Sequence, residues 1–365
     1  MGDKYARVRV AAVQAASVFL NREGSTDKAC RLIREAGSNG ARVIGFPEGF
    51  IPAHPEWYHF HIATGAVAYR LSTELFKNAV EIPSPEIDSL CAAARDANAY
   101  VVMGVCEKLR GTTGTMFNTQ VYIGPDGALI GKHQKLAPTV GERLVHMGGF
   151  GDTLGVFESE FGPMSSLVCG ENSNPLAIFT LAAEGTRLHV ASWPCHFSPR
   201  SDAMPHRVSV DSQAFAQMSR AFVISACGTV DERMIAMLEP GPEGEAFLRN
   251  PGRCGGSIVV APDASVIAGP MGPEEGILYA DCDLELCVRN KILQDFAGHY
   301  NRPDVFQLRV NRARPHIYAV GATGEAAALP GMQPQAPTLA PAGVPGAPEL
   351  PSSNTAAAIR LNKNS

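Results

Sequence analysis

The sequence predicts a layered α/β fold, because short apolar runs typical of buried strands alternate with longer helix-like runs in its first half. Two further pairs of strand-like runs, at 117–136 and 254–270, enclose tight turns and add hairpins to this alternation. The chain has 365 residues, of which 45% are apolar, and this composition suits a sizeable core. We therefore expect an α/β frame built on mixed sheets.

The first half begins with a strand, a helix and a second strand. Residues 7–16 are small and β-branched, as is typical of a buried strand. Residues 25–40 predict a helix, with Ser25 as a candidate N-cap and a glycine at the end. Residues 41–50 predict a second buried strand, which Pro47 stops.

A second helix and a third strand follow at 85–99 and 100–108. The run 117–136 then places two strand-like segments around "GPDG", which indicates a hairpin. The first half thus has the order strand, helix, strand, helix, strand and hairpin.

The second half looks like a looser copy of the first. Residues 164–169, 188–194 and 221–228 are three further candidates for buried strands. The run 254–270 repeats the hairpin design, with "APDAS" at its turn. We therefore expect two similar halves whose sheets stack face to face.

Proline and alanine without apolar periodicity dominate the sequence from about Val320. Such a composition cannot compensate for the entropy lost on ordering. We expect one domain over residues 1–319 and a disordered tail over residues 320–365.

Charge and cysteine content favour a cytoplasmic protein with a small-molecule partner. The net charge of -5 gives no basic field for nucleic acid, and no apolar run approaches the roughly 18 residues that cross a membrane. The nine cysteines include no CxxC pair, which argues against a zinc ribbon or a redox motif. The first 16 residues pass directly into a strand-like run, without the apolar region of a signal peptide.

Cys169 ends the candidate strand 164–169 and precedes a predicted helix. Asn174 resembles an N-cap and Pro175 the first helical position. The predicted apolar face of this helix comprises Leu176, Phe179 and Ala183. Because a helix N-terminus favours an anion, we expect a lowered thiol pKa and a nucleophilic Cys169. The alternative is an inert core cysteine.

Two other strand ends carry charged residues. Glu48 comes directly after Pro47, which ends the second strand. Lys135 comes just after another strand, and Glu142 follows seven residues later. The chemistry of α/β sheets gathers beyond the carboxyl ends of strands. A carboxylate, an ammonium group and a thiol at such ends indicate covalent catalysis. We expect desolvation to raise the pKa of Glu48.

Histidines offer two alternatives. Cys169 could form a papain-like pair with His189 or His196, although nothing in the sequence places either beside the thiol. His54, His59 and His61 lie close together in "HPEWYHFH", but no second group of ligands has matching spacing, so a loop at the pocket mouth or an interface is favoured over a metal site.

Four stretches resemble, in order, motifs of the nitrilase (carbon–nitrogen hydrolase) superfamily. "FPEGFIP" at 46–52, "KHQKLAPTVGER" at 132–143 and "LVCGENSNPL" at 167–176 are similar to its three catalytic motifs. "HVASWP" at 189–194 is similar to a stretch that marks true nitrilases. "DFAGHYNRPDVFQL" at 295–308 is also similar to the C-terminal segment of bacterial nitrilases.

The resemblance implies a four-layer αββα sandwich and a nitrilase, which converts an organic nitrile to the carboxylic acid and ammonia. It implies Cys169 as the nucleophile, Glu48 as the general base and Lys135 as the cation that stabilises developing negative charge. Glu142 would be a second glutamate that orients Lys135 or the substrate. No cofactor and no metal are implied, and the protein would form homo-oligomers, either dimers or larger spiral assemblies.

A substrate pocket is also expected near Cys169. Many nitrilases carry tryptophan directly after the nucleophile, whereas this chain has glycine, which changes the pocket wall and leaves the substrate preference open. The residues expected to form this pocket are His54, Trp57, Gly170, Asn172, Trp193 and Pro194.

Three alternatives to a nitrilase remain at this point. An amidase or carbamoylase of the same superfamily would use the same four residues, and a cyanide-hydrolysing enzyme is a narrower variant. The non-enzymatic alternative is a catalytically silent scaffold subunit. The presence of the cysteine, both glutamates and the lysine argues against it.

Overall fold

The computed structural model describes residues 2–197, 199 and 203–315. The predicted tail at 320–365 and the predicted boundary at residue 319 lie outside the described residues. No helix in the described part of the chain is both long and apolar enough to cross a bilayer.

The first sheet has six strands in the order β11-β1-β2-β3-β4-β5. Strands β1, β2 and β3 pair in parallel, whereas β4, β5 and β11 pair antiparallel to their neighbours. The bounds are β1 (Arg7–Gln14), β2 (Val43–Gly45), β3 (Tyr100–Lys108), β4 (Met116–Ile123), β5 (Leu129–Gln134) and β11 (Gly276–Asp283).

The second sheet has five strands in the order β10-β9-β8-β7-β6 and repeats the pattern of the first. Three parallel strands again precede an antiparallel hairpin, so the predicted similarity of the two halves is confirmed. The bounds are β6 (Met164–Val168), β7 (Leu188–Trp193), β8 (Phe222–Cys227), β9 (Ile258–Val260) and β10 (Val266–Ala268).

Side-chain alternation along the strands builds four layers. On β1, Val10 and Ala12 point toward the second sheet, where they join Val190 and Ile224 in one buried cluster. Ala11 and its alternate neighbours point the other way, toward the helices. Each sheet therefore has one face for its partner sheet and one for helices.

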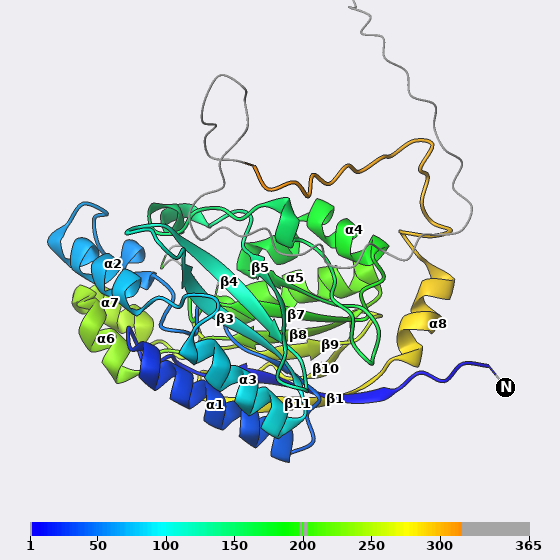
Figure 1. The fold of residues 1–365 in the computed structure, drawn as a ribbon, viewed down its shortest axis with the longest axis horizontal. Helices are drawn as coiled ribbons and strands as arrows, with labels where there is room; N and C mark the ends of the chain where they lie inside the picture. Colours follow the sequence, from blue (N-terminus) through cyan, green and yellow to red (C-terminus); the bar gives the residue numbers. More distant parts are fainter. Residues whose placement is uncertain (1, 198, 200–202, 316–365) are drawn as a thin grey trace, which may run out of the picture. The chain divides into compact units, whose positions relative to one another are not determined.

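Two pairs of helices cover the outer faces (Figure 1). Helices α1 (Arg22–Ser38) and α3 (Pro85–Ala97) pack on the first sheet, and α4 (Pro175–Ala183) and α5 (Met204–Ser219) pack on the second. The expected four-layer αββα sandwich is thus the observed architecture.

Helix α1 begins earlier than predicted. Its N-cap is Asn21, whose Oδ1 accepts a hydrogen bond from the backbone N–H of Gly24 at 2.9 Å. Ser25 is buried inside the first turn, where its hydroxyl bonds to the backbone of Val18. The prediction of Ser25 as the cap is therefore wrong.

A satellite cluster at one end of the sheets involves segments that the sequence did not predict. It contains buried side chains from α2 (Ala66–Asn78), α6 (Glu232–Leu238) and α7 (Gly241–Leu248), with Trp57 among them. The other elements not predicted are α5, α8 (Glu285–Leu293), β11 and the short 3₁₀ turns η1 (Glu56–His59), η2 (Val140–Leu144), η3 (Gly151–Thr153) and η4 (Cys169–Ser173).

Candidate active site

Cys169 lies at a strained corner between β6 and η4. Its backbone φ of 52° is in the left-handed region, which residues other than glycine rarely adopt. The side chain is buried at the floor of a cavity and is 5% exposed. Strain of this kind clusters at functional sites, so the corner supports a functional role for the thiol.

The helix after Cys169 is present, but its buried face differs from the prediction. Asn174 caps α4 by accepting from the backbone N–H of Leu176 at 3.0 Å, and Pro175 is the first helical residue, as predicted. Leu176 is 61% exposed, whereas Ile178 and Leu181 are buried against the second sheet. The predicted apolar face was wrong because the sheet contacts the side of the helix that carries these two residues.

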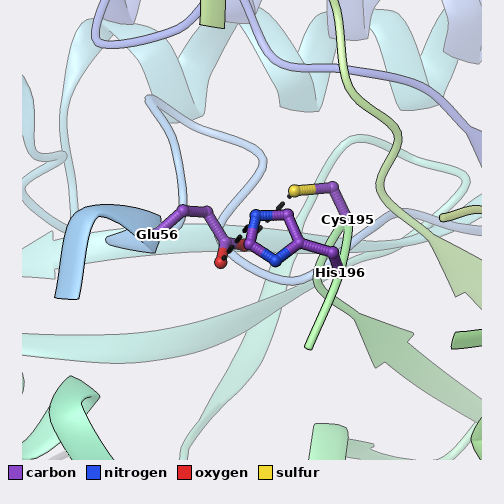
Figure 2. Close-up of side chains that lie close together, drawn as sticks. All are labelled: Glu56, Cys195 and His196. Carbon is purple, nitrogen blue, oxygen red and sulfur yellow. Dashed lines mark hydrogen bonds and ion pairs between the residues drawn. The ribbon is translucent and has the colours of Figure 1, made fainter. Parts of the chain in front are cut away.

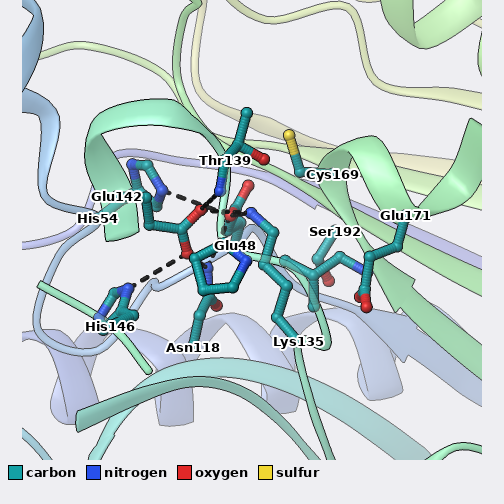
Figure 3. A network of polar contacts seen from close by, with 12 residues as sticks. Glu48, His54, Asn118, Lys135, Thr139, Glu142, His146, Cys169, Glu171 and Ser192 are labelled. Atoms are coloured by element: carbon teal, nitrogen blue, oxygen red, sulfur yellow. Dashed lines mark hydrogen bonds and ion pairs between the residues drawn. The ribbon is translucent and has the colours of Figure 1, made fainter. Parts of the chain in front are cut away.

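Lys135 lies between two buried glutamates (Figure 3). Its Nζ donates to Oε1 of Glu48 at 2.8 Å and to Oε2 of Glu142 at 2.6 Å. All three side chains are fully buried, and all three residues line the cavity with Cys169. The structure therefore brings together the four residues that the motifs indicated.

Asn118 on β4 holds the two glutamates in place, and sequence analysis missed it. Its Nδ2 donates to Oε1 of Glu48 at 2.7 Å and to Oε1 of Glu142 at 2.8 Å. Glu142 also accepts from the backbone N–H of Thr139. Oε2 of Glu48, by contrast, has no hydrogen-bond partner among the described residues. That oxygen is free to accept a proton.

Glu171 ties the Cys169 corner to the Lys135 segment. One carboxylate oxygen accepts from the backbone N–H of Leu136 at 2.7 Å, and the other accepts from the backbone N–H of Val168 at 3.1 Å. His133 Nε2 is 3.0 Å from the second oxygen. This bridge spans residues adjacent in sequence to the lysine and the cysteine, so it fixes the distance between their backbones.

The cavity has a volume of about 470 Å³ and mostly apolar walls. Of the predicted pocket residues, His54, Gly170, Trp193 and Pro194 line it. Tyr58 and His59 also line it, and they belong to the loop that was expected at the pocket mouth or an interface. Further lining residues that were not predicted are Thr139, Val140, Gly141, His196, Phe197, Arg207 and Asp211. Apolar walls with charged groups at the floor suit a small organic molecule that carries one polar reacting group.

Two predicted pocket residues lie elsewhere. Trp57 packs in the satellite cluster of α2, α6 and α7, where it is 2% exposed. Asn172 turns its Nδ2 to the carbonyl oxygens of Leu167 and Cys169 and is fully buried. Both predictions were wrong because tertiary packing draws these side chains into the core.

Comparison with known proteins gives the family. Residues 9–291 match the family model described as carbon-nitrogen hydrolase. The chain belongs to the carbon–nitrogen hydrolase family. It is 36% identical over 312 residues to a nitrilase of Bacillus sp. (strain OxB-1), which covers 85% of this chain and 90% of the relative.

More distant relatives agree with this placement. An arylacetonitrilase of Aspergillus kawachii is 33% identical over 325 residues, covering 87% of this chain and 96% of the relative. The crystal structure of the C. elegans NitFhit protein is similar in fold, with a TM-score of 0.64 at 18% identity, covering 85% of this chain and 68% of that one.

The thiol of this carbon–nitrogen hydrolase does not have the predicted lowered pKa. Burial and the neighbouring Glu48 carboxylate raise the pKa of Cys169, and they outweigh the opposite effects of Lys135 and the Gly170 backbone N–H. The helix that was expected to stabilise the thiolate begins at Pro175, beyond η4. The resting cysteine is therefore a thiol, and a base must remove its proton.

Glu48 also differs from the expectation of a raised pKa. Burial raises the pKa of this carboxyl, but Lys135 and His54 together outweigh burial and hold it below its usual value. Glu142 has a lowered pKa for the same reason, because the effects of Lys135 and His146 exceed that of burial. Both glutamates are carboxylates at neutral pH, so Glu48 is ready to act as a base.

The papain-like pair is not formed through His189. Its Nδ1 is 2.8 Å from Oγ of Ser165 and its Nε2 is 2.9 Å from Oδ1 of Asn172, so both ring nitrogens already have partners. His196 has its Nδ1 on the carbonyl oxygen of Phe197 at 2.8 Å. Its Nε2 lies 3.5 Å from Oε2 of Glu56, and among the described residues no hydrogen bond joins either imidazole to Cys169.

In the part of the chain that the structure describes, two groups of side chains have donor atoms close enough to hold a metal ion, with all atoms of each group within 4.8 Å of one another. One comprises Glu56, Cys195 and His196 (Figure 2), and the other comprises Glu48, His54 and Glu142. In the second group, the Lys135 ammonium already bonds to both glutamates. Of the histidines in "HPEWYHFH", His61 contacts the carbonyl oxygen of Leu238 instead of joining either group.

Proposed function

We propose that this carbon–nitrogen hydrolase is a nitrilase that converts an organic nitrile to its carboxylic acid and ammonia. The observation that carries the proposal is the convergence of Cys169, Glu48 and Lys135 on one buried cavity. The relatives named nitrilase and arylacetonitrilase, which match over most of their length, support the choice of nitriles.

The first step forms a covalent thioimidate. Oε2 of Glu48 takes the thiol proton of Cys169 as the sulfur attacks the nitrile carbon, so that an S–C bond forms and one C–N π bond breaks. The proton then passes to the nitrile nitrogen, which leaves Glu48 ionised again. Lys135 stabilises the negative charge that develops on that nitrogen.

The second step releases ammonia and then the acid. Glu48 takes a proton from water as the water oxygen adds to the thioimidate carbon, and it passes this proton to the nitrogen. As the C=O bond forms, the hydroxyl proton also moves to the nitrogen, and the C–N bond breaks to release ammonia and leave a thioester. A second water, activated in the same way, cleaves the thioester and restores the Cys169 thiol. Two waters are consumed in total. Glu142 holds Lys135 in place, because its Oε2 accepts a hydrogen bond from Nζ of Lys135 at 2.6 Å.

Ammonia release from paired nitriles and amides tests this proposal. The panel comprises small aliphatic, benzylic and aromatic nitriles, their matching amides and cyanide. We expect release from organic nitriles and little from amides. Release from amides alone would contradict the proposal in favour of an amidase or carbamoylase, and release from cyanide alone would indicate a cyanide hydrolase. A folded protein that is silent on the whole panel would indicate a scaffold subunit.

We also propose that the protein is cytoplasmic and forms homo-oligomers, either dimers or larger spirals. All nine cysteines are free thiols, which suits a reducing compartment. Leu176 on α4 and Val210 on α5 are exposed apolar side chains on the outer helical layer, where a second copy could cover them. Size-exclusion chromatography coupled to light scattering measures the molar mass in solution. A monomer mass would contradict the homo-oligomer.

Gly170 sets the size of the cavity next to the nucleophile. A Cβ at this position would meet only Oγ1 of Thr139, at 3.9 Å, so the space beside it is open. We expect Gly170→Leu to raise the KM for arylacetonitriles on the order of tenfold while small aliphatic nitriles are affected much less. Steady-state kinetics on both classes measure this, with Gly170→Ala as the control. An equal effect on both classes would contradict a role in substrate size.

A further inference from the structure

The imidazole of His54 lies between two buried carboxylates. Its Nδ1 is 3.0 Å from Oε1 of Glu56. Its Nε2 is 3.3 Å from Oε1 of Glu48, close enough for an ion pair (Figure 3). The His54 side chain is 7% exposed, and those of Glu56 and Glu48 are 1% and 0% exposed. Both ring nitrogens therefore face carboxylate oxygens in a site nearly free of solvent.

This geometry selects one protonation state of the ring. A neutral imidazole carries a single N–H, so its other nitrogen would direct a lone pair at a carboxylate oxygen. In a buried site, such a contact is repulsive and only weakly screened. Only the imidazolium carries an N–H on both ring nitrogens, the one beside Glu56 and the one within ion-pair distance of Glu48.

The charges around the active centre lead to the same conclusion. Glu48, Glu142 and Glu56 contribute three carboxylates, and Lys135 contributes one ammonium group. With a neutral His54, these five side chains would carry two uncompensated negative charges, which burial makes unfavourable. A protonated His54 reduces the excess to one.

We propose that His54 is a permanently charged positioning residue that keeps Glu48 ionised and aligned, and that Glu56 is the buried carboxylate that keeps His54 charged. This inference rests on the proposed function insofar as Glu48 is the base for Cys169. It adds a second cation, opposite Lys135, on the carboxylate that accepts the thiol proton.

The electrostatic balance supports this assignment. Burial lowers the pKa of His54, but Glu56 and Glu48 outweigh it and raise that pKa to about 10. Burial raises the pKa of Glu56, but His196 and His54 outweigh it and lower that pKa to about 2. The thiol of Cys195 also donates to Glu56 at 3.3 Å (Figure 2). The ion pair therefore persists across the neutral pH range.

Other titratable groups face this pair from every neighbouring segment. They are Tyr58 and His59 on η1, Lys135 after β5, Glu142 and His146 on and after η2, Cys169 on η4, and Cys195 and His196 after β7. Burial lowers the pKa of His59 to about 4 and also lowers the pKa of His146. Those two rings are neutral at pH 7, so neither replaces the charge on His54.

Histidine-selective ¹⁵N NMR of the free protein tests the charge on His54 directly. We expect an imidazolium signal that persists from pH 6 to pH 8.5 and that is missing in His54→Gln, where the signal of any other charged histidine remains. In Glu56→Gln, the same ring should become neutral within this range. A neutral His54 at pH 7.5 in the unmutated protein would overturn the inference. This experiment needs no substrate, so failure of the proposed function would leave its result unchanged.

The pH dependence of nitrile turnover tests the positioning role. Loss of the neighbouring cation raises the pKa of Glu48, so the acidic limb of kcat/KM should move up by about one pH unit or more in His54→Gln and in Glu56→Gln. Glu56→Asp should restore the limb, and His61→Gln is the matched control. Because both residues act through one ion pair, the double variant should lose no more than either single variant.

An acidic limb that stays at the same pH in both single variants would contradict the positioning role, even if kcat falls. Additive losses in the double variant would also contradict it, because independent contributions would not pass through one ion pair. If His54→Gln fails to fold, Glu56→Gln and the NMR spectrum of the unmutated protein still decide the question.

Discussion

Cys169→Ala is expected to abolish ammonia release from nitriles, with a loss of kcat of roughly 10⁶-fold. The variant lacks the sulfur that forms the thioimidate, and Glu48 with Lys135 has no nucleophile to serve. Because the substitution removes only one buried sulfur atom, we expect the variant to adopt the parental fold. Ammonia assays on a reactive nitrile measure the loss.

Cys91→Ala is the matched control for this prediction. Cys91 is a partly buried free cysteine on α3, away from the cavity that holds Cys169. It should keep the parental rate. Residual activity of Cys169→Ala within about a hundredfold of the parent would contradict a nucleophilic role, because it would place most of the catalysis elsewhere.

Lys135→Met is expected to lower both activity and stability. Without the ammonium group, Glu48 and Glu142 remain buried with only Asn118 between them. Removing one partner of a buried ion pair lowers the free energy of unfolding by about 3–5 kcal/mol. The rate should fall at every pH, because no cation then stabilises the charge on the nitrile nitrogen.

The pH dependence of the free energy of unfolding should also differ between Lys135→Met and the parent. In the parent, the lowered pKa values of both glutamates contribute stability that is present above their unfolded pKa and is lost as the pH falls. In the variant, burial and mutual repulsion should raise these pKa values above the unfolded values, so stability is lost as the pH rises. The deficit should therefore be larger at pH 8 than at pH 5.

Chemical denaturation at both pH values measures this deficit. Lys132→Met is the matched control, because Lys132 pairs with the buried Glu107 on the same sheet and lies outside the cavity. It should be destabilised and yet remain active. Equal activity loss in the two lysine variants would show that stability, and not charge at the reacting nitrogen, explains the effect.

Most strands of the two sheets could be predicted because buried strands have a simple local signal. The run "YVVMGVCEK" matches the observed β3 at 100–108, since β-branched residues fill a strand that is covered on both faces. Helix α5 was missed because its sequence mixes polar and apolar residues, and it buries Asp211 and Ser212 along with Phe215. Strand β11 was missed because most of it is only partly buried.

Active-site residues that lie in a sequence motif could be predicted, whereas a residue that acts through contacts with distant segments could not. Glu48, Lys135, Glu142 and Cys169 each lie in a recognisable stretch. Asn118 sits inside β4, and the only available signal was an amide in a strand whose every residue is buried.

The ion pair of His54 and Glu56 was missed for a similar reason. A histidine cluster is typical of metal ligands, and nothing in the local sequence marks Glu56 as the partner of His54. The pKa directions of Cys169 and Glu48 were wrong because both depend on burial and on charges that meet only in the fold. Sequence separation hides several of these contacts, and Glu48, for example, meets Lys135 across 87 positions.

The central claim is that Cys169 forms a covalent bond with the nitrile carbon. Rapid acid quenching of the unmutated protein during turnover, followed by peptide mass spectrometry, tests it directly. We expect the peptide that contains Cys169 to gain the mass of the nitrile, as the thioimidate, or of the acyl group, as the thioester. Turnover without an adduct on that peptide, or with the adduct on another cysteine, would contradict the account.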